Sequence, residues 1–233
     1  MMFKPSILSS VLMLIAVLVF CRLGGCQLDR AERKDTRLIE FASAPQLVEL
    51  PGSAMAAEFA HLTLKGQFRM GKDVLADNQV LNGQSGVHVY TVFETESGKN
   101  ILVNRGWLPM SLSRSPLPLV KTPAGLIEIM GRIGPIPVTG RELGKDIEMS
   151  MEHWPQLQTY PKIGKISAAL QLDLYHWVLF LDENSPGGFS GRQWKPVFMS
   201  PERHRAYAFQ WFAMAMAALA GWIFIAYQRG AKA

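Results

Sequence analysis

Residues 201–212 read PERHRAYAFQWF, which places one histidine between two arginines at the start of a long apolar run. A neutral imidazole is a normal axial ligand for haem iron, and flat aromatic side chains offer a surface for a macrocycle. Arginine pairs well with carboxylates such as the haem propionates. The segment therefore supplies the residue types of a haem site: a metal ligand at His204, aromatic rings at Tyr207 and Trp211, and cations at Arg203 and Arg205.

The same residues have a second explanation that needs no ligand. Tyrosine and tryptophan gather at membrane–water interfaces, and arginines flank membrane spans as anchors, whatever the protein does. By residue type alone, interfacial anchoring explains residues 204–211 better than haem binding does. The elements that carry these side chains must therefore be considered next.

Two uncharged runs predict membrane-spanning helices. Residues 206–227 carry no charge over 22 positions, which at about 1.5 Å per residue matches the hydrocarbon core of a bilayer. Residues 5–21 are also uncharged and span more comfortably if the helix continues past Arg22, whose stem can reach the interface. We predict transmembrane helices at 5–27 and 206–227, with residues 28–204 as a soluble domain between them. The charged stretch after the first span continues its helix into water until Pro45.

On a helical wheel, the second helix has two faces. One face gathers residues that lie within about 60° of one another: His204, Tyr207, Trp211, Ala218 and Trp222. A separate arc follows the small-xxx-small pattern that lets helices approach closely: Ala213, Ala217 and Gly221. We expect the small face to pack on the first helix or on a client protein.

The middle of the chain predicts strands. Runs that alternate, or are rich in β-branched and aromatic residues, occur at 61–68, 86–95, 99–107, 126–133 and 173–183. The turn at Ser97 and Gly98 joins two of them into a hairpin. The expected fold is a membrane protein of the α+β class, in which two transmembrane helices flank a mainly antiparallel β domain, barrel- or sandwich-like.

Composition excludes several classes of protein. Both cysteines, Cys21 and Cys26, lie at the end of the first apolar run, so the soluble domain has no disulfide framework and no CxxC site. It also has no G-x-S-x-G or HExxH motif, which argues against a hydrolase. The net charge of +5 suits lipid headgroups beside the spans, and we expect no nucleic-acid partner.

The first apolar run has an alternative interpretation as a lipoprotein signal. LGGC at 23–26 looks somewhat like a lipoprotein cleavage box, in which Cys26 would be the lipidated residue. Arg22 argues against this, because the region before the cleavage site should be uncharged. The two-helix interpretation is therefore preferred.

A further cluster, Asn104, Arg105, Gly106 and Trp107, lies on a predicted strand. Arg105 and Trp107 are two apart and should share a face, and Gly106 permits close backbone approach. These residues could form a patch that binds a partner or covers a haem edge. The structural alternative, an arginine stacked on a tryptophan, is favoured.

Three stretches carry a family resemblance: LGGCQLDRAERK at 23–34, VHVYTVFETESGKNILVNRGWLP at 87–109 and PERHRAYAFQWFAMA at 201–215. They resemble the surfeit locus protein one family, the cytochrome c oxidase assembly factors. One departure is Cys26, which precedes Gln27 at a position where family members usually have tryptophan. That weakens any role for an aromatic ring at this position.

The resemblance implies a membrane-anchored assembly factor for haem-copper oxidase that assists the binding and insertion of haem a. His204 would hold haem a transiently, and the partners would be the oxidase catalytic subunit and haem a synthase. No enzyme activity is implied. Two alternatives stay open: a cofactor-free scaffold for oxidase subunits, and a b-type electron carrier if a dimer supplied a second axial ligand.

The orientation of the domain is predicted differently by charge and by resemblance. Five basic residues between positions 22 and 38 would place the domain in the cytoplasm by the positive-inside rule. The resemblance implies a domain outside the cytoplasm, and we follow it. Because no Arg- and Ser-rich presequence is present, we expect a multi-pass protein of the bacterial inner membrane with its domain in the periplasm.

Overall fold

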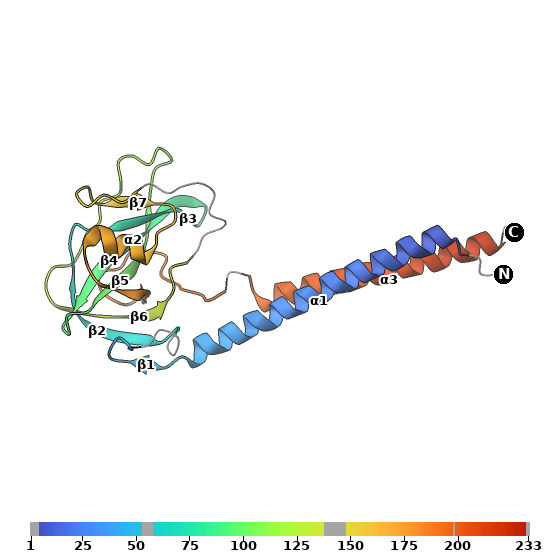
Figure 1. The fold of residues 1–233 in the computed structure, drawn as a ribbon, viewed down its shortest axis with the longest axis horizontal. Helices are drawn as coiled ribbons and strands as arrows, with labels where there is room; N and C mark the ends of the chain where they lie inside the picture. Colours follow the sequence, from blue (N-terminus) through green and yellow to red (C-terminus); the bar gives the residue numbers. More distant parts are fainter. Residues whose placement is uncertain (1–4, 53–57, 138–147, 198, 232–233) are drawn as a thin grey trace. The chain divides into compact units, whose positions relative to one another are not determined.

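The computed structural model describes residues 5–52, 58–137, 148–197 and 199–231, and it divides into two compact units. One unit combines Met1–Ala42 with Lys195–Ala233, and the other is Ser43–Trp194. The first, here called the helix unit, contains α1 (Ile7–Ser43) and α3 (Pro201–Ala231). The second, the β domain, contains eight described strands and the short helix α2 (Ile163–Leu170) (Figure 1).

Both long helices are apolar and long enough to cross a membrane. α1 continues well beyond its apolar part and ends at Ser43, two residues before Pro45, as the sequence predicts. Proline cannot donate the next helical hydrogen bond and disfavours the α conformation in the residue before it. α3 begins at Pro201, a residue suited to the first helical position.

α1 and α3 run along each other in opposite directions (Figure 1). Phe20 stacks on Trp211 with ring centroids 5.9 Å apart, and Gln27, two turns further along α1, meets His204, two turns earlier on α3. Small residues permit this approach. The buried ones are Gly24, Ala31, Ala208, Ala215 and Ala226.

The face of α3 that packs on α1 is not the predicted one. Ala213, Ala217 and Gly221 are exposed, and nothing lies within 4 Å of a Cβ built on Gly221. The packed face instead carries His204, Ala208, Trp211 and Ala215, whose spacings of four, three and four residues are typical of a coiled-coil seam. The expectation that the small face packs on the first helix is therefore wrong, and its packing on a client protein stays a prediction.

The β domain is a closed barrel with additions. The strands are β1 (Gln46–Leu47), β2 (His61–Phe68), β3 (Val74–Leu81), β4 (Gln84–Thr95), β5 (Asn100–Pro109), β6 (Ile127–Gly134), β7 (Gln156–Gln158) and β8 (Leu174–Leu181). Their order is β1-β2-β6-β8-β5-β4-β3-β7, and pairing of β2 with β4 closes a ring of five strands. Pairing is antiparallel except for β1–β2, β3–β7 and β5–β8. The predicted α+β class with a mainly antiparallel β domain is confirmed, and of the two predicted forms, barrel or sandwich, the domain has the barrel.

Side-chain alternation decides what each barrel strand buries. On β5, Ile101 and Val103 point into one core, whereas Leu102 packs into a second core with Ile166 of α2 and Val178 of β8. Successive residues of a strand point to opposite faces, so one strand serves both cores. The predicted hairpin forms as β4 and β5, with Gly98 at φ +77° in its turn.

Candidate functional site

His204 lies in the first turn of α3 and is 7% exposed. Its Nδ1 is 2.8 Å from Oε1 of Gln27 on α1. An amide oxygen only accepts, so Nδ1 carries a proton, and in the neutral imidazole Nε2 is then the nitrogen with the lone pair. Gln27 is the single hydrogen-bond partner of His204 among the described residues. The imidazole is therefore fixed through one nitrogen, and no described residue hydrogen-bonds the other.

Local sequence explains why these two side chains meet. Gly24, Gln27 and Ala31 are spaced by three and four residues and share one face of α1. A Cβ on Gly24 would lie 2.7 Å from the Phe212 ring, so this position has no room for a side chain. Ala208, one turn after His204, is also buried. Small residues on both sides of the polar pair bring the helix axes close enough for a direct hydrogen bond.

The two predicted arginines differ in their surroundings. Arg205 forms an ion pair with Asp35 of α1, and its side chain is 51% exposed. It also lies 3.9 Å from Glu202, one turn earlier on α3. Arg203 is exposed and has no ion-pair or hydrogen-bond partner among the described residues. Arg203 is thus the freer of the two cations beside His204.

The structure separates the predicted aromatic residues. Trp211 is half-buried against Phe20, on the side of α3 that carries His204. Tyr207 is 46% exposed and lies off the seam. Trp222 is partly buried further along α3. His204 and Trp211 are therefore together at the seam, whereas Tyr207 faces outward.

The donor set fits an iron porphyrin rather than a bare metal ion. No group of three or more His, Cys, Asp or Glu side chains that could hold a metal occurs among the described residues. A haem iron needs only an axial ligand from the protein, and ligating histidines commonly donate their other N–H to a protein acceptor. His204 with Gln27 has this arrangement. The residues present therefore fit haem.

Gln27 is a functional candidate that the sequence interpretation missed. In the sequence it stands out only as the residue after Cys26 in the first family stretch. The signal that could have found it is its spacing to Gly24 and Ala31, which marks one face of α1. Cys26 is partly buried and Cys21 exposed, and both are free thiols.

The second candidate, Asn104 to Trp107 on β5, is buried. Asn104 and Arg105 have no exposed surface, and Trp107 is 5% exposed. The guanidinium of Arg105 lies over the rings of Phe68 and Phe189, at 4.8 and 4.7 Å from their centroids. It does not stack on Trp107 as the structural alternative expected.

Arg105 donates to oxygens from three other parts of the β domain. The acceptors are Gly187 O from Nε at 2.7 Å, Thr91 Oγ1 and Thr122 Oγ1 from Nη1 at 3.2 and 2.8 Å, and Lys121 O from Nη2 at 2.5 Å. Burial lowers its pKa to about 10, while the nearby carboxylate of Asp73 opposes that shift. Burial likewise raises the pKa of Asp73, against the effects of Thr91 and Arg105. This network is a structural brace.

The brace holds the segment 185–194, here called the strap, across β5. Phe189 N donates to Arg105 O at 2.6 Å, and Trp107 N donates to Ser190 O at 2.7 Å. Gly106 lies between them at φ +107°, where a Cβ would come within 2.6 Å of Ser190 O. The predicted close approach at Gly106 is confirmed. Asn104 Oδ1 accepts from Gly106 N at 3.1 Å. Contacts inside the β domain therefore explain the burial of all four residues without a partner, and in this conformation they offer no docking surface.

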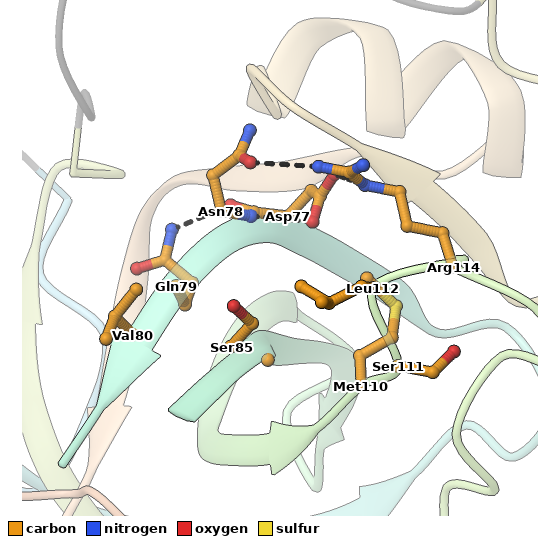
Figure 2. A pocket seen from close by; sticks show the side chains of 10 residues that line it. Asp77, Asn78, Gln79, Val80, Ser85, Met110, Ser111, Leu112 and Arg114 are labelled. Carbon is orange, nitrogen blue, oxygen red and sulfur yellow. Dashed lines mark hydrogen bonds and ion pairs between the residues drawn. The ribbon is translucent and has the colours of Figure 1, made fainter. Parts of the chain in front are cut away.

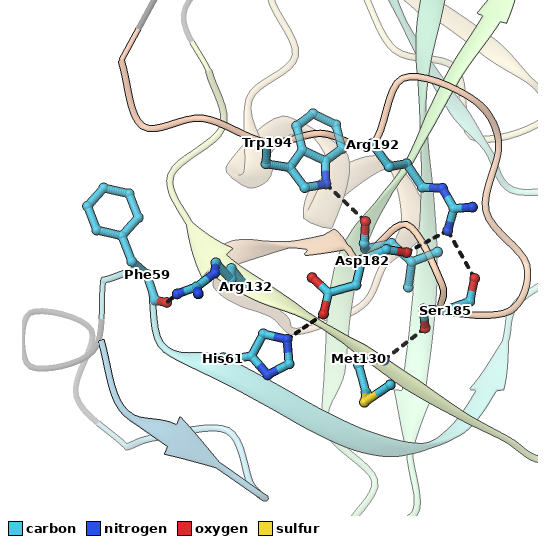
Figure 3. A network of polar contacts seen from close by, with 9 residues as sticks. Phe59, His61, Met130, Arg132, Asp182, Ser185, Arg192 and Trp194 are labelled. Carbon is cyan, nitrogen blue, oxygen red and sulfur yellow. Dashed lines mark hydrogen bonds and ion pairs between the residues drawn. The ribbon is translucent and has the colours of Figure 1, made fainter. Parts of the chain in front are cut away.

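The strap ends in a polar network that Figure 3 shows. Arg192 donates to Asp182 O and Ser185 O at 2.6 and 2.9 Å, and Trp194 Nε1 donates to Leu181 O at 3.0 Å. The Asp182 carboxylate pairs with Nε2 of His61. His61 thus links β2 to the end of β8. The network fixes the end of the strap.

A pocket of about 250 Å³ lies beside the second half of β3 (Figure 2). Arg114 reaches from the loop after β5 to Asp77 and Asn78, with Nε 2.5 Å from Asp77 Oδ2 and Nη2 3.1 Å from Asn78 Oδ1. Asp77 Oδ1 accepts from Asn78 N at 2.7 Å. The charged groups of the pocket are thus paired with each other.

Comparison with known proteins gives one family. The model of the SURF1 family matches residues 14–216. Three proteins named as uncharacterised SURF1-like proteins, two from strains of Mycobacterium tuberculosis and one from Mycobacterium bovis, are 24% identical over 235 residues. The matches cover 96% of this chain and 84% of those proteins. The matched range includes both His204 and Gln27.

Proposed function

The chain belongs to the SURF1 family, known generally for oxidase assembly factors, and from this premise we propose that it is a membrane-anchored assembly factor for haem-copper oxidase. It holds haem a transiently as cargo and assists the insertion of that haem into the catalytic subunit. Its partners are that subunit and haem a synthase. The chain acts without catalysing a reaction of its own.

The contact between His204 and Gln27 carries this proposal. Neutral imidazole with its Nδ1 proton accepted by an amide is the state in which Nε2 can bind iron. Arg203 is exposed and Arg205 half-exposed beside it, so both have guanidinium groups that can pair with propionates. Trp211 adds an aromatic surface on the same side of α3.

A single protein ligand suits a carrier that must release its cargo. Stable low-spin haem normally takes two axial ligands, and this site has one imidazole, His204, at the seam of the two helices among the described residues. Axial binding by one nitrogen is weaker than by two. The arrangement therefore supports hand-over more than permanent retention.

We place the protein in the bacterial inner membrane, with the β domain in the periplasm. Two helices that are long and apolar enough to cross a bilayer support membrane anchoring. With two spans, the β domain between them lies on one side of the membrane. A periplasmic phosphatase fused to a loop of this domain is expected to be active, and activity of a cytoplasmic reporter there would contradict the placement.

A second candidate function is a cofactor-free scaffold for oxidase subunits. It is favoured by the packing of the His204 and Trp211 face against α1, which gives these side chains a purely structural explanation. The two functions differ in whether the purified protein carries haem.

The test is purification of the full chain in detergent from cells that do or do not make haem a. Wild-type protein is expected to carry up to one haem a per chain, and His204→Ala to remain in the membrane without haem. His153→Ala is the matched control, because His153 is exposed in the β domain. Colourless wild-type protein that still restores oxidase assembly would reject haem binding and favour the scaffold.

A further inference from the structure

We infer that Gln27 is a positioning residue for His204: through Oε1 it holds the imidazole as the Nδ1–H tautomer and so presents Nε2 as the atom that binds an iron porphyrin. This inference rests on the proposed function, because it assigns a role within the same site. It adds a residue of α1 to a site otherwise built from α3.

The first step is the geometry of the contact. Nδ1 and Oε1 are 2.8 Å apart, which is a normal hydrogen-bond length for these atoms. The imidazole is 7% exposed, so water has little access to replace the glutamine as acceptor. With the other tautomer, a lone pair on Nδ1 would face a lone pair on Oε1, so the amide would have to turn over and present its NH2 group.

The second step is that the helix pair fixes the glutamine. Gln27 belongs to a regular helix and lies between Gly24 and Ala31, the two buried residues of α1. Phe212 fills the space over Gly24. The close approach of the backbones holds Gln27 opposite His204.

The third step is the chemical consequence. Tautomers of histidine differ in which ring nitrogen has a lone pair for a metal, and the hydrogen bond at the other nitrogen sets the choice. A hydrogen bond at Nδ1 also makes Nε2 a better donor to the metal. Loss of the acceptor should therefore weaken binding even though Gln27 is not itself a ligand.

One arm of the experiment measures the tautomer without any ligand. The full chain, with its five histidines labelled with ¹⁵N, is studied in detergent by NMR, and His204→Ala identifies the His204 signal. Wild type should show the Nδ1–H form. Gln27→Met, which keeps the side-chain length but lacks a strong acceptor, should shift His204 toward the other tautomer. An Nε2–H form in wild type, or no change in Gln27→Met, overturns the inference.

The other arm titrates ferric protoporphyrin IX into the same proteins. Gln27→Met should bind about tenfold more weakly than wild type or worse, as is usual when a partner of a metal-binding histidine is lost. Gln27→Glu keeps an acceptor and should restore binding. In the ferrous state, the iron–histidine stretching frequency should fall in Gln27→Met and rise in Gln27→Glu. A role of Gln27 in helix packing alone would not produce this opposite pair of shifts.

The control is Gln210→Met, which makes the same chemical change at an exposed position of α3. It should bind the porphyrin as wild type does. If Gln27→Met also binds like wild type while His204→Ala loses binding, the positioning role is rejected and the proposed function stands. If His204→Ala binds as tightly as wild type, the haem site itself fails, and the role of Gln27 fails with it.

Discussion

Arg105 in the β domain and His204 in the helix unit are both buried polar side chains, but their surroundings differ. The Arg105 guanidinium donates to four oxygens and lies over two phenyl rings. His204 has one hydrogen-bond partner among the described residues, and none of them contacts its second nitrogen in this way. A fully satisfied buried group stabilises a fold, whereas a half-satisfied one has capacity for a ligand. The difference separates a structural motif from a binding motif.

Removal of the brace should produce the largest change. Arg105→Met leaves four oxygens without their donor and the buried Asp73 without its cation. We expect the free energy of unfolding of the β domain to fall by about 3–5 kcal/mol. The measurement is urea unfolding followed by tryptophan fluorescence.

The control for Arg105→Met is Lys65→Met, which removes an exposed cation 3.7 Å from Glu128. It should change the stability by less than about 1 kcal/mol. The comparison breaks down if Arg105→Met is as stable as wild type. If Arg105→Met loses stability while the His204 tautomer is unchanged, the structural role of Arg105 is separate from the site at His204.

A smaller effect is expected from pH, through the histidine next to the brace. Burial lowers the pKa of His88 from 6.5 to about 4. Between these values the unfolded chain binds a proton that the folded chain does not, so stability falls as pH decreases from about 6.5 to 4. The loss should reach roughly 2–3 kcal/mol, and above pH 6.5 the contribution is constant.

The measurement compares wild type with His88→Gln in urea at several pH values. Stability of His88→Gln should depend less steeply on pH in this window. Identical slopes would show that His88 titrates normally in the folded protein. Other titrating groups contribute equally to both proteins and cancel in the difference.

The smallest effect concerns the helix unit. In Gly24→Ala, the added methyl would lie 2.7 Å from the tip of the Phe212 ring, so the ring or the helices must shift. Overpacking of this kind costs about 1–3 kcal/mol, partly offset by the better helix propensity of alanine. Gly25→Ala is the control, because nothing lies within 4 Å of its Cβ position.

Thermal loss of helicity in detergent should occur at a lower temperature in Gly24→Ala than in Gly25→Ala. If the helices shift rather than the Phe212 ring, the His204 signal in NMR should also change in Gly24→Ala alone, because the contact to Gln27 would lengthen. Equal melting of the two variants would mean that the close helix approach is unimportant.

Local pattern was sufficient for most of the elements. Alternation of Leu62, Leu64 and Phe68 predicted β2, and the turn at Gly98 predicted the β4–β5 hairpin. α2 was missed because its eight residues cover only two turns, which is too short for a clear helical period. The sequence pattern did not predict that β2 pairs with β4 and closes the barrel, because barrels and sandwiches share the same alternation.

The candidate site was only half predictable. A helical wheel places His204 and Trp211 on one face of α3 but wrongly adds Tyr207 to it. The wheel also does not say which face packs on α1, and the pattern of small residues indicated the wrong one. Gln27 and His204 are 177 positions apart, so no local pattern connects them. The predicted stacking of Arg105 on Trp107 is wrong because Gly106, between them, has a positive φ. This conformation breaks the alternation that would place the two side chains on one face.

The length of α1 has a consequence for how the protein tolerates different bilayers. Its 37 residues extend about 55 Å, whereas a hydrocarbon core is about 30 Å thick. All charged residues of α1 lie in the half that begins at Arg22. A bilayer thicker or thinner by about 3 Å therefore displaces the helix by roughly two residues, and arginine can absorb that shift by reorienting its stem. The anchor should accept membranes of unequal lipid composition without drawing its acidic and basic groups into the acyl chains.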